Sequence, residues 1–270
     1  MCRKLFYLVV VVALMSGTAQ AAMVHQWAFN CDNNPGFDSV GGTNATLMGT
    51  AMTALGQLWT DASAGCYADL GGPAIGINTY SAFSLVLWST QYTDQGYSMT
   101  AALGGTQDWF GKRYVAISTT RGDQVSRAMI CPGNDNPGYQ SEAGLNWTEL
   151  NDSMEHLYVL TVGAAPAGFP TTNLVLSYWV DGQFIGMLNM GNRTIAGLSN
   201  DFAYLAKGLY PGDPLFAGGI NEFDIYSNAL SGDEIQAIYA AGPLQGCIPE
   251  PATMVLLGFG SLALIRRRKS

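Results

Sequence analysis

Short apolar runs separated by turn-forming residues are the feature that most limits the folds open to this chain. Each run is five to seven residues long and is bounded by Gly, Pro, Asn or Asp, which adopt the backbone angles that turns need. The runs lie at residues 24–29, 45–49, 66–70, 83–89, 114–118, 125–130, 157–162, 174–180, 184–189, 202–206 and 220–226. This pattern predicts an all-β chain folded as a two-sheet antiparallel sandwich.

Two local signals add detail to this prediction. Asp181-Gly182 separates two of the runs and favours a type I′ hairpin turn, in which both central residues have positive φ. Near the end of the body, Ser231 and Glu234 form a capping box, and Gly242-Pro243 ends the segment. The apolar face between them consists of Ile235, Ile238 and Tyr239. We therefore expect one short C-terminal helix on an otherwise all-β body.

Charge is sparse and unevenly distributed along the chain. Only 12% of the residues are charged, against about 25% in a typical soluble domain, and 33 of the 270 residues are Gly. Six of the 12 basic residues lie in the two terminal segments, so residues 22–248 hold six basic and 19 acidic residues, a net charge of −13. Because a phosphate-binding face must be basic, this balance argues against nucleic acid as a partner.

The first 21 residues have the three parts of a secretory signal peptide. Arg3 and Lys4 form the charged region, residues 5–15 are apolar, and Ala19-Gln20-Ala21 is an A-x-A cleavage site. The alternative is a permanent membrane helix, but the apolar run of about 11 residues is shorter than the about 20 that a span needs. We expect cleavage after Ala21.

The last 22 residues also have three ordered parts. Pro249-Glu250-Pro251 excludes a helix and keeps the approach extended. Residues 252–265 form a short apolar segment, predicted to be a helix whose length is only marginally sufficient to cross a membrane. Residues 266–269 form a basic tail that stops transfer on the cytoplasmic side. The basic residues of this tail are Arg266, Arg267, Arg268 and Lys269.

Together these three parts resemble the PEP-CTERM sorting signal of Gram-negative bacteria. The internal Leu-Leu-Gly-x-Gly pattern of that family is present at residues 256–260, and residues 244–248 would be a linker to the body. The resemblance implies export, transient anchoring in the inner membrane, and processing by an exosortase near Pro249-Glu250-Pro251. It also implies release toward the cell surface or an extracellular polysaccharide matrix. The alternative is an ordinary tail anchor.

The body carries a second resemblance, to the laminin-G-like, concanavalin A-like jelly roll. The segments that carry it are 27–30, 38–41, 45–49, 83–88, 178–182 and 218–231. The most specific of these is 218–231, in which a strand is followed by Ala229-Leu230-Ser231 and the predicted helix. The resemblance implies one jelly-roll domain over residues 22–243. Residues 92–151 depart from the family pattern, so the number of strands there stays open.

No catalytic site is predicted. Glu222-Phe223-Asp224 resembles part of the acidic strand of some jelly-roll glycoside hydrolases, which needs two same-face carboxylates. Ser227 stands where the second Glu of that pattern belongs, so the acid is missing. The two histidines, His25 and His156, are not accompanied by a Gly-x-Ser-x-Gly elbow. We expect a non-enzymatic protein, with an atypical glycoside hydrolase as an alternative.

Cysteines and oxygen-rich loops supply the remaining structural candidates. Four cysteines follow the signal peptide, and three pairings are open to them. The preferred pairing is Cys31 with Cys66, and unpaired thiols are the alternative. The Asn- and Asp-rich loops 31–38 and 134–138 are candidates for structural Ca²⁺, with ordinary turns as the alternative. The sequence predicts no required cofactor and no clustered metal centre.

Five aromatic residues outside the clear strands are candidates for stacking against a glycan. They are Trp59, Trp109, Phe110, Tyr139 and Trp147. The alternative is that they cover long loops. We therefore expect an exported surface or matrix protein that binds extracellular polysaccharide or a surface protein without catalysis. A purely structural matrix protein with no specific ligand is the other alternative.

Overall fold

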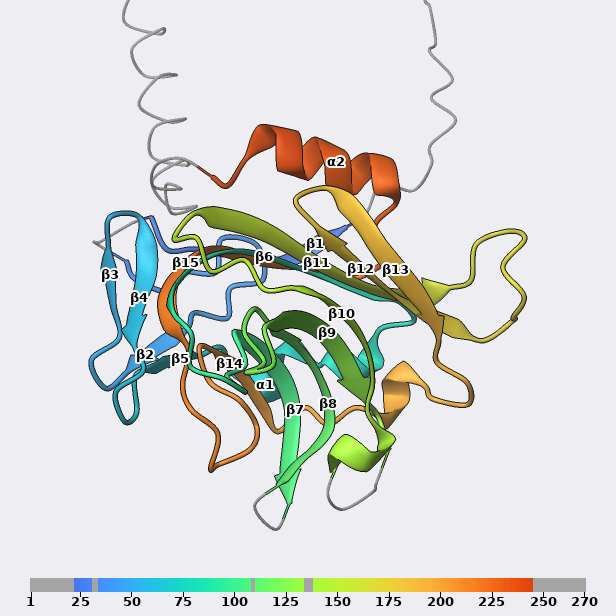
Figure 1. Ribbon diagram of the computed structural model, residues 1–270, viewed down its shortest axis with the longest axis horizontal. Coiled ribbons are helices and arrows are strands. Elements are labelled where there is room, and N and C mark those ends of the chain that lie inside the picture. Colours follow the sequence, from blue (N-terminus) through green and yellow to red (C-terminus); the bar gives the residue numbers. More distant parts are fainter. Residues whose placement is uncertain (1–21, 31–33, 108–109, 134–137, 245–270) are drawn as a thin grey trace, which may run out of the picture.

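The computed structural model describes residues 22–30, 34–107, 110–133 and 138–244, which form two antiparallel β-sheets packed face to face. Figure 1 shows the two sheets as the layers of a sandwich, with one helix lying across the far side of the upper layer. This arrangement confirms the all-β, two-sheet sandwich predicted from the apolar runs.

The first sheet has eight strands, in the order β13-β12-β11-β6-β15-β4-β3, with β1 also paired to β15. Its strands are β1 (Met23–Ala28), β3 (Met52–Ala54), β4 (Gln57–Asp61), β6 (Phe83–Thr93), β11 (Glu155–Ala164), β12 (Leu174–Val180), β13 (Gln183–Asn189) and β15 (Ala217–Tyr226). The last strand, β15, lies between β6 and the strands β4 and β1, so the end of the body closes the centre of this sheet.

The second sheet has seven strands, in the order β10-β9-β8-β7-β14-β5-β2. Its strands are β2 (Thr46–Met48), β5 (Tyr67–Asp69), β7 (Ala101–Gln107), β8 (Phe110–Ser118), β9 (Val125–Cys131), β10 (Ala143–Thr148) and β14 (Phe202–Leu205). Four of these strands, β7 to β10, follow one another along the chain and pair in that order, so they form a meander.

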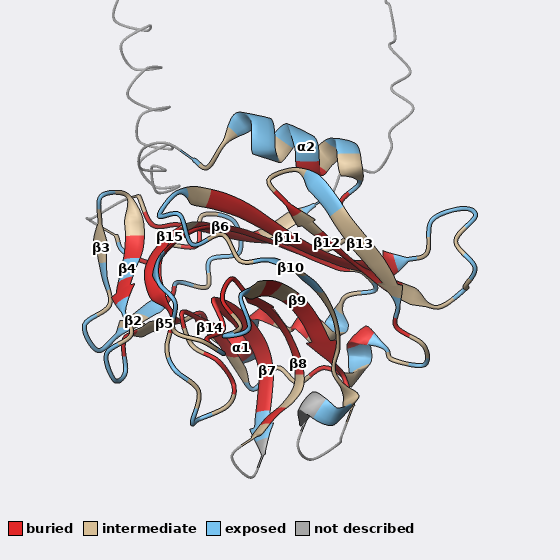
Figure 2. Cartoon of the chain, viewed as in Figure 1, coloured by how far each residue is buried: buried red, intermediate tan, exposed pale blue. Residues whose placement is uncertain are grey.

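The main core lies between the sheets, where alternate residues of each strand point inward. On β8, Val115 and Ile117 are fully buried in this core, and Leu85 and Leu87 of β6 meet it from the other sheet. Figure 2 shows the buried residues concentrated on the central strands of both layers. Burial of these inner faces is the main stabilising term of a sandwich.

Helix α2 (Gly232–Ala241) covers the outer face of the eight-stranded sheet, the face that points away from the main core. Its buried Ile235 packs with Val86, Trp88 and Leu157 of that sheet. The Ser231 hydroxyl accepts the Glu234 backbone N–H, and the Glu234 carboxylate accepts the Ser231 N–H, so the predicted capping box is confirmed. Among the described residues, no helix is long and apolar enough to cross a membrane.

All eleven predicted strands are present, and the hairpin turn is confirmed by positive φ at Asp181 (49°) and Gly182 (72°). The sequence prediction missed β3, β4, β7 and β10. It also missed the short helix α1 (Gly72–Ile75) and the 3₁₀ turns η1 (Ile77–Thr79), η2 (Gly138–Ser141) and η3 (Ile195–Gly197). The open region 92–151 therefore holds the end of β6, all of β7 to β10, and η2.

Candidate binding site

The outer face of the seven-stranded sheet carries a second set of buried side chains, opposite in direction to the main core. On β8 this set includes Tyr114 and Ala116, which alternate with the core residues Val115 and Ile117. On β9 it includes Met129. A helix lies over the outer face of the other sheet, whereas here the cover is the loop that follows β14, which contributes Leu209 and Tyr210. This face is therefore only partly closed.

A hydrogen-bonded network crosses that face from β8 to β10. The Arg127 guanidinium donates from Nε (2.8 Å) and Nη2 (2.7 Å) to Glu142 Oε1, and from Nη1 to Asn146 Oδ1 (2.6 Å). The buried Tyr114 hydroxyl donates to the other carboxylate oxygen of Glu142. Burial and the Glu142 charge raise the pKa of Tyr114, so this phenol stays protonated and remains a donor.

Tyr210 joins the loop after β14 to this network. Its hydroxyl lies 3.1 Å from that of Tyr114, and the two rings meet edge to face with their centroids 5.9 Å apart. Gly111 makes room for the ring, because a Cβ at that position would lie 2.5 Å from Tyr210 Cε2. The hydroxyl and the ring of Tyr114 therefore hold Tyr210 in place, over the space that Gly111 leaves open on β8.

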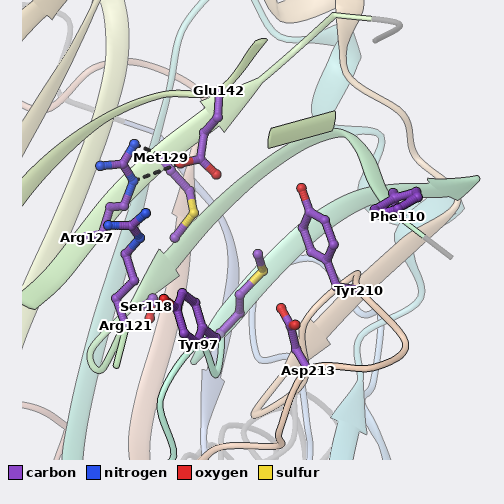
Figure 3. Close-up of a pocket in the computed structure, with 10 residues that line it drawn as sticks. Tyr97, Phe110, Ser118, Arg121, Arg127, Met129, Glu142, Tyr210 and Asp213 are labelled. Atoms are coloured by element: carbon purple, nitrogen blue, oxygen red, sulfur yellow. Dashed lines mark hydrogen bonds and ion pairs between the residues drawn. The ribbon is translucent and has the colours of Figure 1, made fainter. Parts of the chain in front are cut away.

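These groups surround a cavity of about 500 Å³. Ligand pockets in proteins commonly measure about 300–1,000 Å³ and combine aromatic walls with a few polar groups. The lining consists of Tyr97, Met99, Phe110, Ser118, Arg121, Arg127, Met129, Glu142, Tyr210 and Asp213. In Figure 3 the two arginines lie on one side, and Tyr210, Phe110 and Asp213 lie on the other. We refer to this cavity as the sheet pocket.

Two lining groups, the exposed Tyr97 and the half-buried Asp213, suit contact with a ligand. Tyr97 is 58% exposed, and its ring lies beside Gly122, where a Cβ would come within 3.2 Å of it. Burial raises the pKa of Asp213 to about 6, and among the described residues its carboxylate has no ion-pair partner. The sheet pocket thus offers an exposed ring and an acceptor whose charge changes near pH 6.

The aromatic candidates from the sequence lie in different places. Phe110 lines the sheet pocket. Trp59 lies on β4 of the other sheet, 37% exposed, and stacks on Tyr92 with ring centroids 5.5 Å apart. Trp147 lies on β10 and packs toward the main core. Trp109 lies outside the described residues, and the Tyr139 side chain is not described.

Most of the pocket residues were not identifiable from the sequence. Tyr97, Arg127, Glu142, Tyr210 and Asp213 come from four separate parts of the chain, and only the tertiary fold brings them together. The one local signal is the turn-forming stretch 210–213, in which the Asp213 N–H donates to the Tyr210 carbonyl (3.0 Å).

Both carboxyl groups of the acidic pair on β15 are buried. Glu222 and Asp224 are 5% and 3% exposed on the outer face of the eight-stranded sheet. Glu222 accepts Gln26 Nε2 (2.9 Å) and the Leu244 backbone N–H (2.7 Å). Burial raises the pKa of both carboxyls, and the charge of Glu222 adds to the effect on Asp224. This geometry supports a structural role for the pair.

The two histidines are each held by carboxylates. His25 Nδ1 lies 2.7 Å from Asp38 Oδ2, and Asp38 also accepts backbone N–H groups of the 39–43 turn. Although burial opposes it, these hydrogen bonds lower the pKa of Asp38. Asp38, the last residue of the 31–38 calcium candidate, therefore holds the turn that follows it. Among the described residues, no cluster of His, Cys, Asp or Glu could hold a metal ion.

Several predicted sites lie outside the described residues. These are Cys31, the stretches 31–33 and 134–137 of the two calcium candidates, the signal peptide with Ala19 and Ala21, and residues 249–269. Cys66 is fully buried, and its pairing with Cys31 stays a prediction, as does calcium binding.

The C-terminal residues match one family model, described as the PEP-CTERM protein-sorting motif, over residues 248–269. The chain carries a PEP-CTERM sorting motif. Such a motif implies exosortase-processed export and sorting to the cell surface, as the order of Pro-Glu-Pro, apolar segment and basic tail predicted. No curated protein sequence matches the chain.

Solved structures similar to the body are β-sandwich domains. Domain 4 of AbnA, a GH43 extracellular arabinanase from Geobacillus stearothermophilus, in complex with arabinotriose, aligns at 16% identity and a TM-score of 0.56, covering 80% of this chain and 98% of that domain. The CBM40 of the Ruminococcus gnavus IT-sialidase, bound to α2,3-sialyllactose, aligns at 14% and 0.53, covering 72% and 96%. The binding domain of botulinum neurotoxin serotype G aligns at 13% and 0.58, covering 82% and 51%. At these identities the likeness establishes the jelly-roll fold.

Proposed function

We propose that this exported PEP-CTERM protein is a non-catalytic carbohydrate-binding component of the cell surface or extracellular matrix. The sheet pocket is the observation that carries the proposal. It combines the exposed ring of Tyr97, which can stack on a sugar, with the carboxylate of Asp213, which can accept sugar hydroxyls.

The pocket wall is rigid, and this rigidity supports ligand binding. Arg127, Glu142, Tyr114 and Tyr210 are fixed by one another, so little side-chain entropy is lost when a ligand docks. The structural neighbours include a domain in complex with arabinotriose and one bound to sialyllactose. The proposal includes transient anchoring of the sorted protein in an inner membrane and its release into a polysaccharide matrix.

Isothermal titration of the purified protein with a panel of bacterial exopolysaccharides and their oligosaccharides tests the proposal. Tyr97→Ala should weaken binding about tenfold, because the exposed stacking surface is lost. Tyr92→Ala is the matched control: its ring is 40% exposed but lies beside Trp59, on the eight-stranded sheet.

The two variants also distinguish the aromatic candidates. If Tyr92→Ala abolishes binding and Tyr97→Ala does not, the ligand lies on the Trp59–Tyr92 pair and the sheet pocket is the wrong site. If the wild-type protein binds no polysaccharide, the carbohydrate-binding proposal fails and the purely structural matrix protein is favoured.

A further inference from the structure

The basic residues of the body are gathered on one side of the sandwich. Residues 22–244 contain six Lys and Arg residues, and the strands of the eight-stranded sheet and helix α2 contain none of them. Five lie on the seven-stranded sheet or in loops that follow its strands: Lys112, Arg113, Arg121, Arg127 and Lys207. The sixth, Arg193, follows β13 and reaches the Ser141 carbonyl in η2 (3.1 Å).

Most of these cations are occupied by groups of the protein itself. Arg113 donates to the carbonyls of Gly197 (2.7 Å) and Leu198 (3.3 Å). Arg127 is paired with Glu142, and Arg121 with Asp123 (2.7 Å). The guanidinium groups of these three arginines therefore have partners within the protein itself.

Lys207 is held differently. Its Nζ lies 4.0 Å from the centroid of the Tyr67 ring and 4.5 Å from that of the Tyr204 ring. Among the described residues, no carboxylate lies within ion-pair distance of it. Cation–π contacts of this kind fix an ammonium group while leaving its charge uncompensated. Lys207 therefore presents a positioned positive charge.

This charge lines a second cavity on the same face, of about 260 Å³. Its walls include Thr106, Phe202, Tyr204, Leu209 and Pro211. Phe202 stacks on Tyr204 with centroids 5.4 Å apart, and Tyr67 meets Tyr204 edge to face at 5.2 Å. One loop borders both cavities: Lys207, Gly208, Leu209 and Pro211 line the smaller one, and Tyr210 and Asp213 line the sheet pocket.

From this juxtaposition we infer that the smaller cavity is a second subsite of the proposed carbohydrate site and that it takes a uronic acid unit of an acidic polysaccharide. Lys207 Nζ binds the sugar carboxylate in a charge-assisted hydrogen bond, and the half-buried ring of Phe202 in the cavity wall contacts the apolar face of the sugar. The polymer then crosses the 207–213 loop into the sheet pocket. Because the strands of the eight-stranded sheet and helix α2 contain no Lys or Arg, the positioned charge of Lys207 gives an acidic polymer a binding point on this face. The inference rests on the proposed function.

The test compares one polymer in two charge states. Polygalacturonate and the galactan made from it by reducing its carboxyl groups are titrated into the full-length protein at low and at 0.5 M salt. The acidic polymer should bind at least tenfold more tightly at low salt, and the difference should shrink at high salt. Lys207→Gln should lower the affinity for polygalacturonate to that for the reduced polymer, whereas Lys207→Arg should retain most of the preference.

Lys112→Gln is the matched control, because it removes one positive charge from the same sheet without lining either cavity. Thermal unfolding of each variant verifies that the fold is intact, and the salt dependence of the wild type tests the inference without any substitution. Equal binding of both polymers, or undiminished binding by Lys207→Gln, would overturn the second subsite and leave carbohydrate binding standing. Binding of neither polymer nor any other polysaccharide would remove the proposed function as well.

Discussion

At the scale of single residues, His156 shows how one imidazole ties distant segments together. Its Nδ1 lies 2.7 Å from Asp181 Oδ2 in the β12–β13 turn, and its Nε2 lies 3.0 Å from Asp152 Oδ1 in the loop before β11. Burial lowers the pKa of His156, but the hydrogen bonds and charges of the two carboxylates more than offset that effect and raise it. The charged imidazolium is therefore the form that the fold favours.

This raised pKa predicts a pH-dependent stability. The folded state holds the His156 proton more tightly than the unfolded state does. The stabilisation that the charged imidazolium gives the fold is therefore complete below about pH 6.5 and is lost as the pH rises through the folded-state pKa. His156→Gln should lower the free energy of unfolding by on the order of 1 kcal/mol at pH 6, a modest amount because both carboxylates are partly solvated. The loss should be smaller at higher pH, where the wild-type imidazole is neutral. Urea denaturation between pH 5 and 9 measures the difference. Asp152→Asn should reduce this pH slope without abolishing it, and a His156→Gln slope equal to that of the wild type would contradict the assignment.

At the scale of elements, local signals decided which segments were predictable. The hairpin at Asp181-Gly182 and the capped helix α2 were found because their turn and cap residues are adjacent in sequence. Strand β7 was missed because its sequence, Ala-Ala-Leu-Gly-Gly-Thr-Gln, has few β-branched or aromatic residues. Gly105 is nevertheless needed there, since a Cβ would lie 2.7 Å from Asp201 Oδ2.

The cap of α2 gives a prediction at this scale. Ser231→Ala removes the hydroxyl that accepts the Glu234 N–H, so it should lower the free energy of unfolding by about 1 kcal/mol. Guanidinium denaturation of the variant measures this loss. Ser227→Ala, a half-buried serine before the cap with one long hydrogen bond to the Ala22 carbonyl (3.4 Å), is the control and should change stability by less than about 0.5 kcal/mol. An equal loss in both variants would show that the cap contributes nothing specific.

At the scale of the whole molecule, the sorting of the protein was easier to predict from the sequence than the position of its candidate binding pocket. The sorting motif is contiguous, so its three ordered parts were recognisable from residues 249–269. The sheet pocket is discontinuous, with Tyr97 and Tyr210 more than a hundred residues apart, and its shape depends on sheet pairing and on Gly111. Residue types alone therefore offered candidate glycan-stacking aromatics, with loop covering as the alternative, and did not locate the cavity.

The sorting motif leads to a prediction for the full chain in cells that contain the exosortase. Glu250→Ala, or deletion of residues 266–269, should leave most of the protein as unprocessed precursor and reduce its surface display. Intact-mass measurement and cell fractionation read out both effects. Gln245→Ala, just outside the motif, should be processed like the wild type. Normal processing and display of the two motif variants would show that these residues are not required.

The tie at Leu244 sets the path of any mechanical load. Its N–H is held by Glu222 of the eight-stranded sheet, and its carbonyl accepts Asn30 Nδ2 (2.9 Å), five residues before Pro249. The sheet pocket lies on the opposite side of the sandwich. A pull between a bound polymer and the C-terminal segment therefore runs across the two layers, perpendicular to the strands. Such tension is resisted by the inward-facing side chains of the two sheets, such as Phe223 of β15 and Val115 of β8, rather than by the hydrogen bonds within each sheet.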